Sequence, residues 1–337
     1  MTLTMSHPRR IGPFEIAPIG LGCMNLSHAY GAPPLPEQAE RLLLQALDMG
    51  VNHFDTAALY GFGANETLVG RVLKAHRSRI VLASKGGMAG ETFPDGVRRV
   101  INGRPEAIRR HCEDSLQRLG TDVIDLYYLH RWDKAVPIED SVGEMSLLVE
   151  EGKVRVLGLS EVSAVTLRRA HAVHPISAVQ TEYSLWTRNP EIAVLQACRD
   201  IGAAFVAFSP TARAFLTGKL QDVSALDAKD IRRGMPRFAP ENYARNLALL
   251  PAYETLAREA RCTPVQLALA WLLSRGEHVI PLPGTTSTDH LRENVGACKV
   301  QLSASVLARA DALINQHTVT GGRYGAQSES EVDTERF

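Results

Sequence analysis

Four polar side chains stand at or just beyond the ends of successive short apolar runs in the first 130 residues of the chain. Asp55 ends the run HFD, Tyr60 follows it in the next loop, Lys85 ends the run ASK, and His130 ends the run LYYLH. Each residue alone has an ordinary structural explanation, such as a turn cap or a satisfied core histidine. Because the carboxyl ends of adjacent parallel strands converge on one mouth, their shared position predicts a single site.

These residue types suit proton transfer to a carbonyl group. A phenol with an ordinary pKa of about 10 is a poor acid at neutral pH. The ammonium of Lys85 favours the phenolate of Tyr60, and the carboxylate of Asp55 keeps that ammonium charged and oriented. We therefore predict that Tyr60 is a tuned general acid, which protonates a carbonyl oxygen as hydride reaches the carbon. His130 is expected to hydrogen-bond the same oxygen.

The elements that must position these residues are short runs rich in Val, Ile and Phe that do not alternate with polar residues. Such runs are typical of strands buried on both faces of a parallel sheet. We predict eight strands, at residues 16–21, 51–55, 80–84, 123–130, 154–159, 178–181, 204–209 and 279–282. Amphipathic segments lie between them, with helices predicted at residues 36–49, 105–119, 138–151 and 244–260.

Eight strand–helix units predict one (β/α)8 TIM barrel, in the α/β class, spanning residues 1–320 and followed by a tail at 321–337. The alternative, a doubly wound dinucleotide-binding sheet, lacks a GxGxxG motif after the first strand. A short hairpin before Ile16 is expected to plug the barrel bottom. The long charged loop 218–242 after strand seven predicts a lid or a disordered segment. A helix near 303–315 precedes the tail, which either frays or folds over the mouth.

The composition excludes several classes of protein. The 37 basic residues equal the 37 acidic ones, so we expect neither a nucleic-acid nor a membrane partner. The five scattered cysteines contain no CxxC pair, which argues against a disulfide framework or a metal site. The first residues lack the apolar run of a signal peptide, and no apolar stretch reaches the roughly 20 residues that span a bilayer. We therefore expect a cytoplasmic protein.

Several stretches between residues 16 and 297 resemble the aldo-keto reductase superfamily, in its broad-specificity bacterial and plant-type branch. They are GLGCM at 20–24, NHFDTAALYG at 52–61, NETLVGRVLK at 65–74, ASKGG at 83–87, SLQRLGTDVIDLYYLHR at 115–131, EGKVRVLGLSE at 151–161, QTEYSL at 180–185 and PLPGTTSTDHLREN at 281–294. The resemblance implies an NAD(P)H-dependent reduction of aldehydes and ketones to alcohols. It also implies that Asp55, Tyr60, Lys85 and His130 form the catalytic tetrad.

The resemblance further implies a nicotinamide cofactor, and assigns its contacts to residues at the ends of later strands. Glu161 departs from the family, which usually has Asn there, and Thr286, Ser287 and His290 stand where many members carry Lys or Arg for a 2′-phosphate. The resemblance implies NADPH as the cofactor, and the missing cations leave NADH as an alternative. The implied contacts are Ser160 and Gln180 to the carboxamide, Phe208 stacked on the nicotinamide, Ser209 and Arg213 at the pyrophosphate, Gly284, Thr285, Thr286 and His290 at the phosphate end, and Glu293 and Asn294 to adenine.

The partner expected from this arrangement is a small-molecule carbonyl substrate; the sequence gives no oligomeric state. Arg131 either binds a substrate carboxylate or pairs with Asp133. One rival function is a cofactor-binding regulatory or redox-sensing subunit with little turnover. Another is a barrel hydrolase or isomerase, which would need a metal cluster or paired carboxylates. The residues expected to rim the substrate pocket are Met24, Asn25, Phe62, Arg131 and Trp132.

Overall fold

Eight parallel strands form the centre of the computed structural model, which describes residues 8–27 and 29–337. The hydrogen-bonded order is β3 to β4, β5, β8, β9, β10, β11 and β12. The two end strands meet, because Gly20 N donates to Pro281 O at 3.1 Å and Gly22 N donates to Pro283 O at 3.0 Å. The strands are β3 (Leu21–Gly22), β4 (His53–Asp55), β5 (Val81–Gly86), β8 (Ile124–Leu129), β9 (Val154–Ser160), β10 (Ile176–Glu182), β11 (Ala204–Phe208) and β12 (Val279–Leu282).

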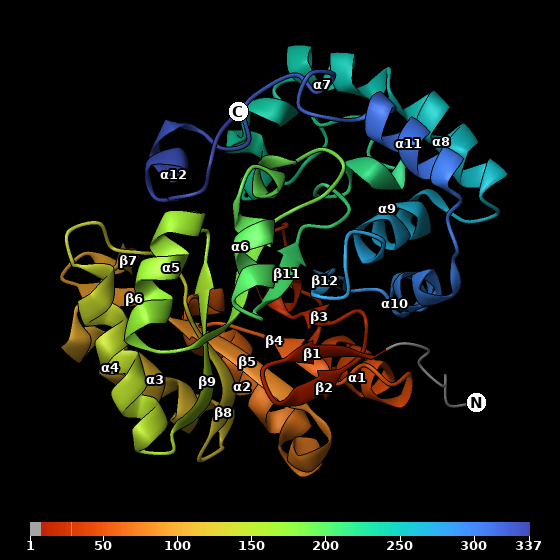
Figure 1. The fold of residues 1–337 in the computed structure, drawn as a ribbon. Coiled ribbons are helices and arrows are strands. Elements are labelled where there is room, and N and C mark those ends of the chain that lie inside the picture. The colour runs from red at the N-terminus through yellow and green to blue at the C-terminus, as the bar shows by residue number, and fades with distance from the viewer. Residues whose placement is uncertain (1–7, 28) are drawn as a thin grey trace.

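Helices surround this barrel and confirm the predicted (β/α)8 architecture (Figure 1). Helix α3 illustrates how the local sequence sets the bounds of a helix. It begins with Pro105 in its first turn and is followed by Gly120, whose φ is +62°. The α-helices are α1 (Pro36–Asp48), α2 (Ala64–Leu73), α3 (Pro105–Leu119), α4 (Ile138–Glu150), α5 (Ala164–Val173), α6 (Val194–Asp200), α7 (Pro240–Leu247), α8 (Leu250–Glu259), α9 (Pro264–Leu273), α10 (Thr288–Gly296), α11 (Ala304–Leu313) and α12 (Ala326–Ser330).

The hairpin β1 (Arg9–Ile11) and β2 (Phe14–Ile16) closes the amino-terminal end of the barrel. Ile11 and Ile16 are buried in one cluster with inward-facing strand residues such as Leu126 and Tyr128. Figure 1 shows this hairpin on the side of the barrel opposite α7 and α12. The predicted plug is confirmed, and the carboxyl ends of the strands are left as the open mouth. Residues 1–7, in which we expect no leader, lie outside the described part of the chain.

The structure corrects two predicted elements, and proline explains both. The predicted strand 16–21 is interrupted between β2 and β3, because Pro18 lies there and cannot donate a ladder hydrogen bond. The predicted helix 244–260 is two helices, α7 and α8, because Pro251 occupies the first turn of α8.

An antiparallel hairpin that sequence reasoning missed, β6 (Met88–Phe93) and β7 (Gly96–Ile101), follows β5. Its signal is the turn Pro94-Asp95-Gly96 between residues of high strand propensity.

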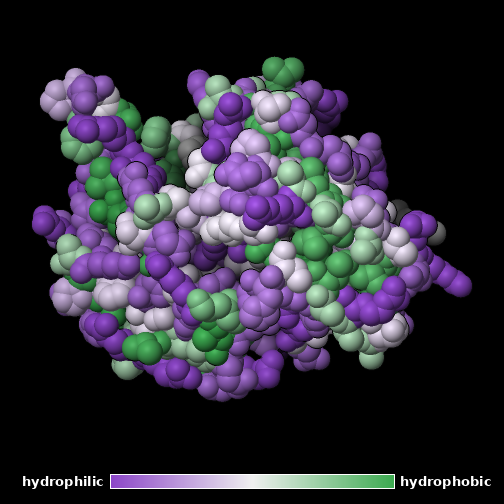
Figure 2. All heavy atoms as spheres, turned by 90° about the horizontal axis from the view of Figure 1, so that it is seen from above, coloured by the Kyte–Doolittle hydropathy of each residue, from purple (hydrophilic) through white to green (hydrophobic). Residues whose placement is uncertain are grey.

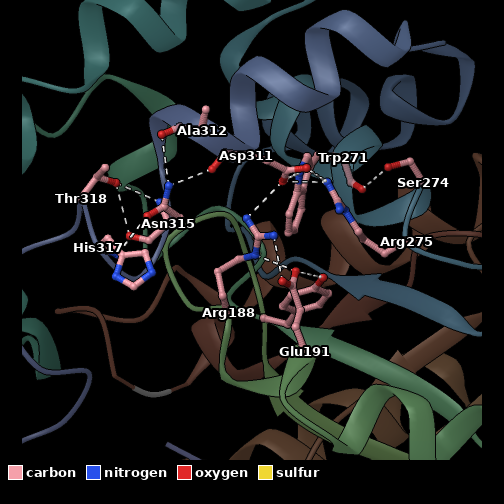
Figure 3. Close-up of polar contacts among 11 residues, drawn as sticks. Arg188, Glu191, Trp271, Ser274, Arg275, Asp311, Ala312, Asn315, His317 and Thr318 are labelled. Carbon is pink, nitrogen blue, oxygen red and sulfur yellow. Dashed lines mark hydrogen bonds and ion pairs between the residues drawn. The ribbon is translucent and has the colours of Figure 1, made fainter. Parts of the chain in front are cut away.

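Asp311 of α11 accepts hydrogen bonds from three side chains that belong to α9 and to the loops after α9 and β10, and these contacts hold α11 against the barrel (Figure 3). Asp311 Oδ1 accepts hydrogen bonds from Trp271 Nε1 at 2.9 Å, from Arg275 Nη2 at 2.9 Å and from Arg188 Nη1 at 3.1 Å. The indole of Trp271 also lies against both guanidinium groups, with centroid distances of 4.8 Å to Arg188 and 4.1 Å to Arg275. These contacts hold the carboxyl-terminal end of α11, after which the chain continues to the tail at the mouth of the barrel.

The tail 321–337 folds back over the mouth rather than fraying. Lys134 Nζ donates to the carbonyls of Ser330 and Val332, and Arg237 Nε donates to that of Gly321. Figure 2, seen from above Figure 1, shows a largely hydrophilic surface on this side that is indented beside a projecting lobe. Within residues 8–27 and 29–337, none of the helices combines the length and the apolar character that crossing a membrane would require.

Candidate active site

A cavity of about 950 Å³ opens at the carboxyl ends of the strands. The loop 218–242, predicted to be a lid or disordered, contributes to its wall through Lys219, Leu220, the short 3-10 helix η6 (Ile231–Gly234) and Met235. The predicted site residues that line the cavity are Met24, Asn25, Asp55, Tyr60, His130, Arg131, Ser160, Gln180, Phe208, Ser209, Arg213, Gly284, Thr285, Thr286, His290, Glu293 and Asn294.

The four residues of the expected tetrad come together at the cavity floor. Lys85 Nζ forms an ion pair with Asp55 Oδ1, and it donates to Thr56 O at 2.8 Å and to the Tyr60 hydroxyl at 3.2 Å. The rings of Tyr60 and His130 meet edge to face, with centroids 5.8 Å apart. Lys85 is fully buried, so it acts on the cavity through Tyr60 and Asp55 rather than by facing it.

The register of the parallel strands explains why residues far apart in the sequence lie at the same height along the barrel. Asp55 pairs with Gly22 of β3 on one side and with Ala83 of β5 on the other. Lys85 pairs with Tyr128 of β8, and Gln180 pairs with Ser160 of β9. Asp55 and Ser160 end their strands, and Lys85 and Gln180 lie close to the carboxyl ends of theirs, so side chains from separate strand–helix units converge.

The electrostatics of the tetrad differ in one respect from the sequence expectation. Burial raises the pKa of Tyr60 above its ordinary value, and the opposing effect of Lys85 does not overcome it. Burial also disfavours the charged form of Lys85, but Asp55 and Tyr60 outweigh it and raise the Lys85 pKa above its ordinary value. The site therefore holds a neutral phenol beside a charged ammonium, with the carboxylate Asp55 beneath them.

Gln180 lines the cavity and also forms a hydrogen bond with a residue of the tetrad. Its Nε2 donates to Asp55 Oδ2 at 2.8 Å, so the second oxygen of the carboxylate is also satisfied. The amide oxygen of Gln180 is not used by this bond. Ser160 accepts a hydrogen bond from Arg131 Nη1 at 3.2 Å, which leaves the hydroxyl proton of Ser160 to be donated.

Two features at the ends of β11 and β12 suit an anion. Ser209, Ala212, Arg213 and Ala214 all have positive φ, between +50° and +76°, and such turns create concave groups of backbone N–H donors. After β12, Ser287 caps α10 by accepting a hydrogen bond from the backbone N–H of His290. The other N–H groups of that first turn stand beside Thr285 and Thr286 on the cavity wall.

Arg213, which we expect at the pyrophosphate, also has a carboxylate partner within the protein. Its Nη2 donates to Glu182 Oε2 at 2.7 Å, and both side chains are buried. Glu161, the departure from the family pattern, is buried too and forms an ion pair with Arg323 of the tail. A guanidinium already neutralised by a buried carboxylate has less to offer a phosphate, so backbone groups are the stronger anion donors here.

Two residues expected at the substrate pocket lie elsewhere. Phe62 is 51% exposed and borders a separate, smaller polar pocket beside Arg110 and Arg118. Trp132 packs against the core, and its Nε1 donates to Val136 O at 2.9 Å. Positive φ values at Gly61 and Phe62 turn the chain after Tyr60, which carries the phenyl ring away from the cavity.

Arg131 remains on the cavity wall and forms no ion pair with Asp133 among the described residues. Its Nη1 donates to His130 O at 2.7 Å as well as to Ser160 Oγ. Asp133 instead accepts backbone N–H groups of Gly103 and Ala135. Of the two interpretations offered for Arg131, pairing with Asp133 is wrong.

Sequence reasoning missed the part of the cavity wall that comes from β6–β7, and it placed the tail at the mouth as one alternative without naming the tail residues that line the cavity. Met88 and Arg99 come from the hairpin, and Tyr324, Ser328 and Glu331 come from the tail. Arg99 joins the two, because its guanidinium pairs with Glu331. Among the residues that the structure describes, no group of three or more His, Cys, Asp or Glu side chains could hold a metal ion.

Comparison with known proteins identifies the family. The aldo/keto reductase family model matches residues 18–315 of the chain. A probable aldo-keto reductase 1 of Glycine max is 44% identical over 327 residues, which cover 96% of this chain and 93% of the relative. The chain belongs to the aldo/keto reductase family. An NADP(+)-named aldo-keto reductase of Schizosaccharomyces pombe is 42% identical to this family member over 98% of each chain.

Solved structures agree with this assignment of an oxidoreductase family. Glycerol dehydrogenase of Gluconobacter oxydans superimposes on this aldo/keto reductase with a TM-score of 0.84 at 28% identity, covering 91% of this chain and 94% of the other. An aldo/keto reductase of Klebsiella pneumoniae, solved in complex with NADP and acetate, gives a TM-score of 0.71 at 28% identity over 95% and 99% of the two chains.

Proposed function

We propose that this aldo/keto reductase reduces aldehydes or ketones to alcohols with NADPH, and that Tyr60 is the proton donor. The observation that carries the proposal is the hydrogen bond from Lys85 Nζ to the Tyr60 hydroxyl, 3.2 Å long, at the floor of the cavity. Because the phenol oxygen accepts this bond, the O–H proton of Tyr60 is the one that can be transferred. Its raised pKa keeps the phenol protonated at neutral pH.

Each tetrad residue then has a distinct role. Tyr60 gives its proton to the substrate oxygen as negative charge develops there. The ammonium of Lys85 stabilises the phenolate that results, and Asp55 keeps the ammonium charged inside a buried site. His130, whose ring packs against that of Tyr60, orients the carbonyl oxygen of the substrate. Nicotinamide, when bound, supplies the hydride that this proton transfer accompanies.

The residues present fit a dinucleotide cofactor. The cavity is long enough to run from the tetrad to the first turn of α10, because residues of both line it. The positive-φ turn at 209–214 and the amino-terminal end of α10 offer two sets of backbone N–H donors for phosphates. Ser160 and Gln180 would hold the carboxamide with the hydroxyl proton and the amide oxygen that their own contacts leave over.

His290 is the residue we assign to discrimination between NADPH and NADH. Arg292 is exposed and pairs with Asp289 at 2.6 Å, whereas His290 lines the cavity beside Thr286. The relative from Schizosaccharomyces pombe carries NADP(+) in its name, and the Klebsiella structure contains NADP. We therefore assign NADPH as the cofactor of this chain, with NADH binding more weakly.

Loss of absorbance at 340 nm tests the function directly. Purified protein with NADPH and 4-nitrobenzaldehyde is expected to consume the cofactor, and NADH is expected to replace it poorly. Fluorescence quenching by each cofactor gives the two affinities independently of turnover. Tight NADPH binding without consumption across a panel of aldehydes and ketones would instead favour the rival redox-sensing subunit.

A further inference from the structure

Four arginines line the cavity, and three of them are neutralised. Arg99 pairs with Glu331 at 2.5 Å, Arg213 with Glu182 at 2.7 Å, and Arg232 with Asp230 at 2.6 Å. The fourth is Arg131. Within the part of the chain that the structure describes, no carboxylate lies within ion-pair distance of it.

The surroundings of Arg131 leave a positive charge at the substrate end of the cavity. Asp55, which also lines the cavity, is paired with Lys85, and Glu331 is paired with Arg99. Neither carboxylate therefore offsets the guanidinium. Arg131 follows His130 directly, and its charge is close enough to Tyr60 to oppose the rise in the pKa of that phenol. A partly buried cation without a counter-ion is stabilised further by an anion that binds beside it.

The guanidinium is also held in place. Nη1 donates to His130 O at 2.7 Å and to Ser160 Oγ at 3.2 Å, so one edge of the group is fixed to the ends of β8 and β9. Nη2 and Nε are not used by these bonds. A fixed planar guanidinium with two remaining donors matches the geometry of a carboxylate, which it can bind through two parallel hydrogen bonds.

We propose that Arg131 is a substrate-binding residue that selects aldehydes and ketones carrying a carboxylate. The proposal rests on the function proposed above, and it names the class of substrate for that same site. The cofactor does not compete for this residue, because the anion-binding backbone lies at the ends of β11 and β12, whereas Arg131 lies at the end of β8, beside β5 and the tetrad. The carbonyl would face Tyr60 and His130 while the carboxylate meets Arg131.

Matched substrates separate charge from shape. The 3- and 4-carboxybenzaldehydes and their methyl esters share a reacting aldehyde, and only the acids carry a negative charge at pH 7. We expect wild-type enzyme to have the higher kcat/KM for at least one acid over its ester. Arg131→Met, which keeps the aliphatic stem, should lower the kcat/KM for that acid by about 10- to 100-fold, mainly through KM, and lower that of the ester far less. Arg131→Lys should restore part of the preference.

A double variant provides the control. Arg99→Gln with Glu331→Gln removes a neutral ion pair from the same cavity, so the ratio of acid to ester kcat/KM should stay close to that of wild type. The carboxylate site is refuted, while the proposed function stands, if wild type reduces the esters without preferring either acid. The same conclusion follows if Arg131→Met lowers the kcat/KM of acid and ester equally, or if it weakens NADPH binding as much as it lowers the kcat/KM for the acid. No consumption of NADPH with any of the four substrates refutes both.

Discussion

Two groups of buried charges each contribute residues to the wall of the cavity, and they are built for different tasks. The first is the pair Asp55 and Lys85 with the phenol of Tyr60. The second, which we call the tail cluster, consists of Glu161, Glu182, Arg213 and Arg323. In the tail cluster, Arg213 pairs with Glu182, Arg323 pairs with Glu161, and Arg323 Nε also approaches Glu182 at 3.5 Å.

The difference lies in whether a group can change its protonation state. Although burial opposes ionisation of Glu182, Arg213, Arg323 and Arg237 together lower its pKa to about 2. Burial is likewise outweighed at Arg213 and Arg323, whose pKa values are raised by the neighbouring carboxylates, so Glu182 and these two arginines are charged at neutral pH. The tetrad instead contains a weak acid, Tyr60, whose neutral form is favoured by burial. Buried charge alone therefore does not indicate a catalytic site. A catalytic site also needs a group beside the charge that can give up its proton, as the phenol of Tyr60 can.

The largest expected effect comes from Tyr60→Phe, which removes the proton donor and leaves the ring. Carbonyl reduction should fall by about 10²- to 10⁴-fold, because that is the contribution of a positioned general acid. NADPH binding, measured by fluorescence quenching, should be retained. Tyr30→Phe is the matched control, because Tyr30 lines the same cavity and accepts a hydrogen bond from Arg213 rather than from Lys85. Wild-type turnover by Tyr60→Phe would show that the acid has been assigned to the wrong residue.

A substitution in the tail cluster should change stability more than chemistry. Glu182→Gln is expected to lower the free energy of unfolding at pH 7 by about 3 kcal/mol, because it leaves buried guanidinium groups without their counter-charge. The lowered pKa of Glu182 gives the sign of its pH dependence. Its stabilising contribution is present above the ordinary pKa of about 4.3 and is lost as pH falls toward about 2.

Urea unfolding between pH 7 and pH 3 measures both effects. The variant should show a shallower loss of stability in acid than wild type does. Glu139→Gln is the control, since Glu139 pairs with Arg169 on the surface and should matter much less. Equal stability of Glu182→Gln and wild type at pH 7 would mean that the tail cluster does not hold the fold together.

Lys85→Met should have a smaller effect than loss of the phenol, and it should also move the pH profile. Reduction should slow by about 10- to 100-fold, because the charged hydrogen bond to Tyr60 is gone. Burial already raises the pKa of Tyr60, and Lys85 opposes that rise, so removal of the ammonium raises the pKa further. The alkaline limb of the rate profile should therefore shift to higher pH.

Lys219→Met is the control for Lys85→Met, because Lys219 is an exposed lysine that also lines the cavity. This variant should keep the wild-type dependence of rate on pH. A limb that moves to lower pH in Lys85→Met would contradict the electrostatic role given to Lys85. Circular dichroism should accompany both measurements, because Lys85→Met leaves Asp55 buried without its ion-pair partner.

The sequence predicts the barrel well because strand position depends on local hydrophobic pattern. The predicted strand 279–282 coincides with β12, and those at 154–159 and 204–209 differ from β9 and β11 by one residue at one end. The tetrad follows from the same pattern, since its residues stand at the carboxyl ends of strands. Tertiary electrostatics is different. The partners of Glu161 and Glu182 in the tail, and the net direction of the Tyr60 pKa, depend on burial and on contacts across the chain that no local pattern encodes.

The ion pair between Glu161 and Arg323 joins residues 162 positions apart, and it has a consequence for biosynthesis. Glu161 is synthesised 162 residues before Arg323, so this ion pair cannot form until residue 323 has been translated. All eight barrel strands precede Arg323 in the chain, since β12 ends at Leu282. A chain that terminates before residue 323 would keep the tetrad residues and lose the part of the cavity wall formed by Tyr324, Ser328 and Glu331, so a complete set of strands is not yet a complete pocket.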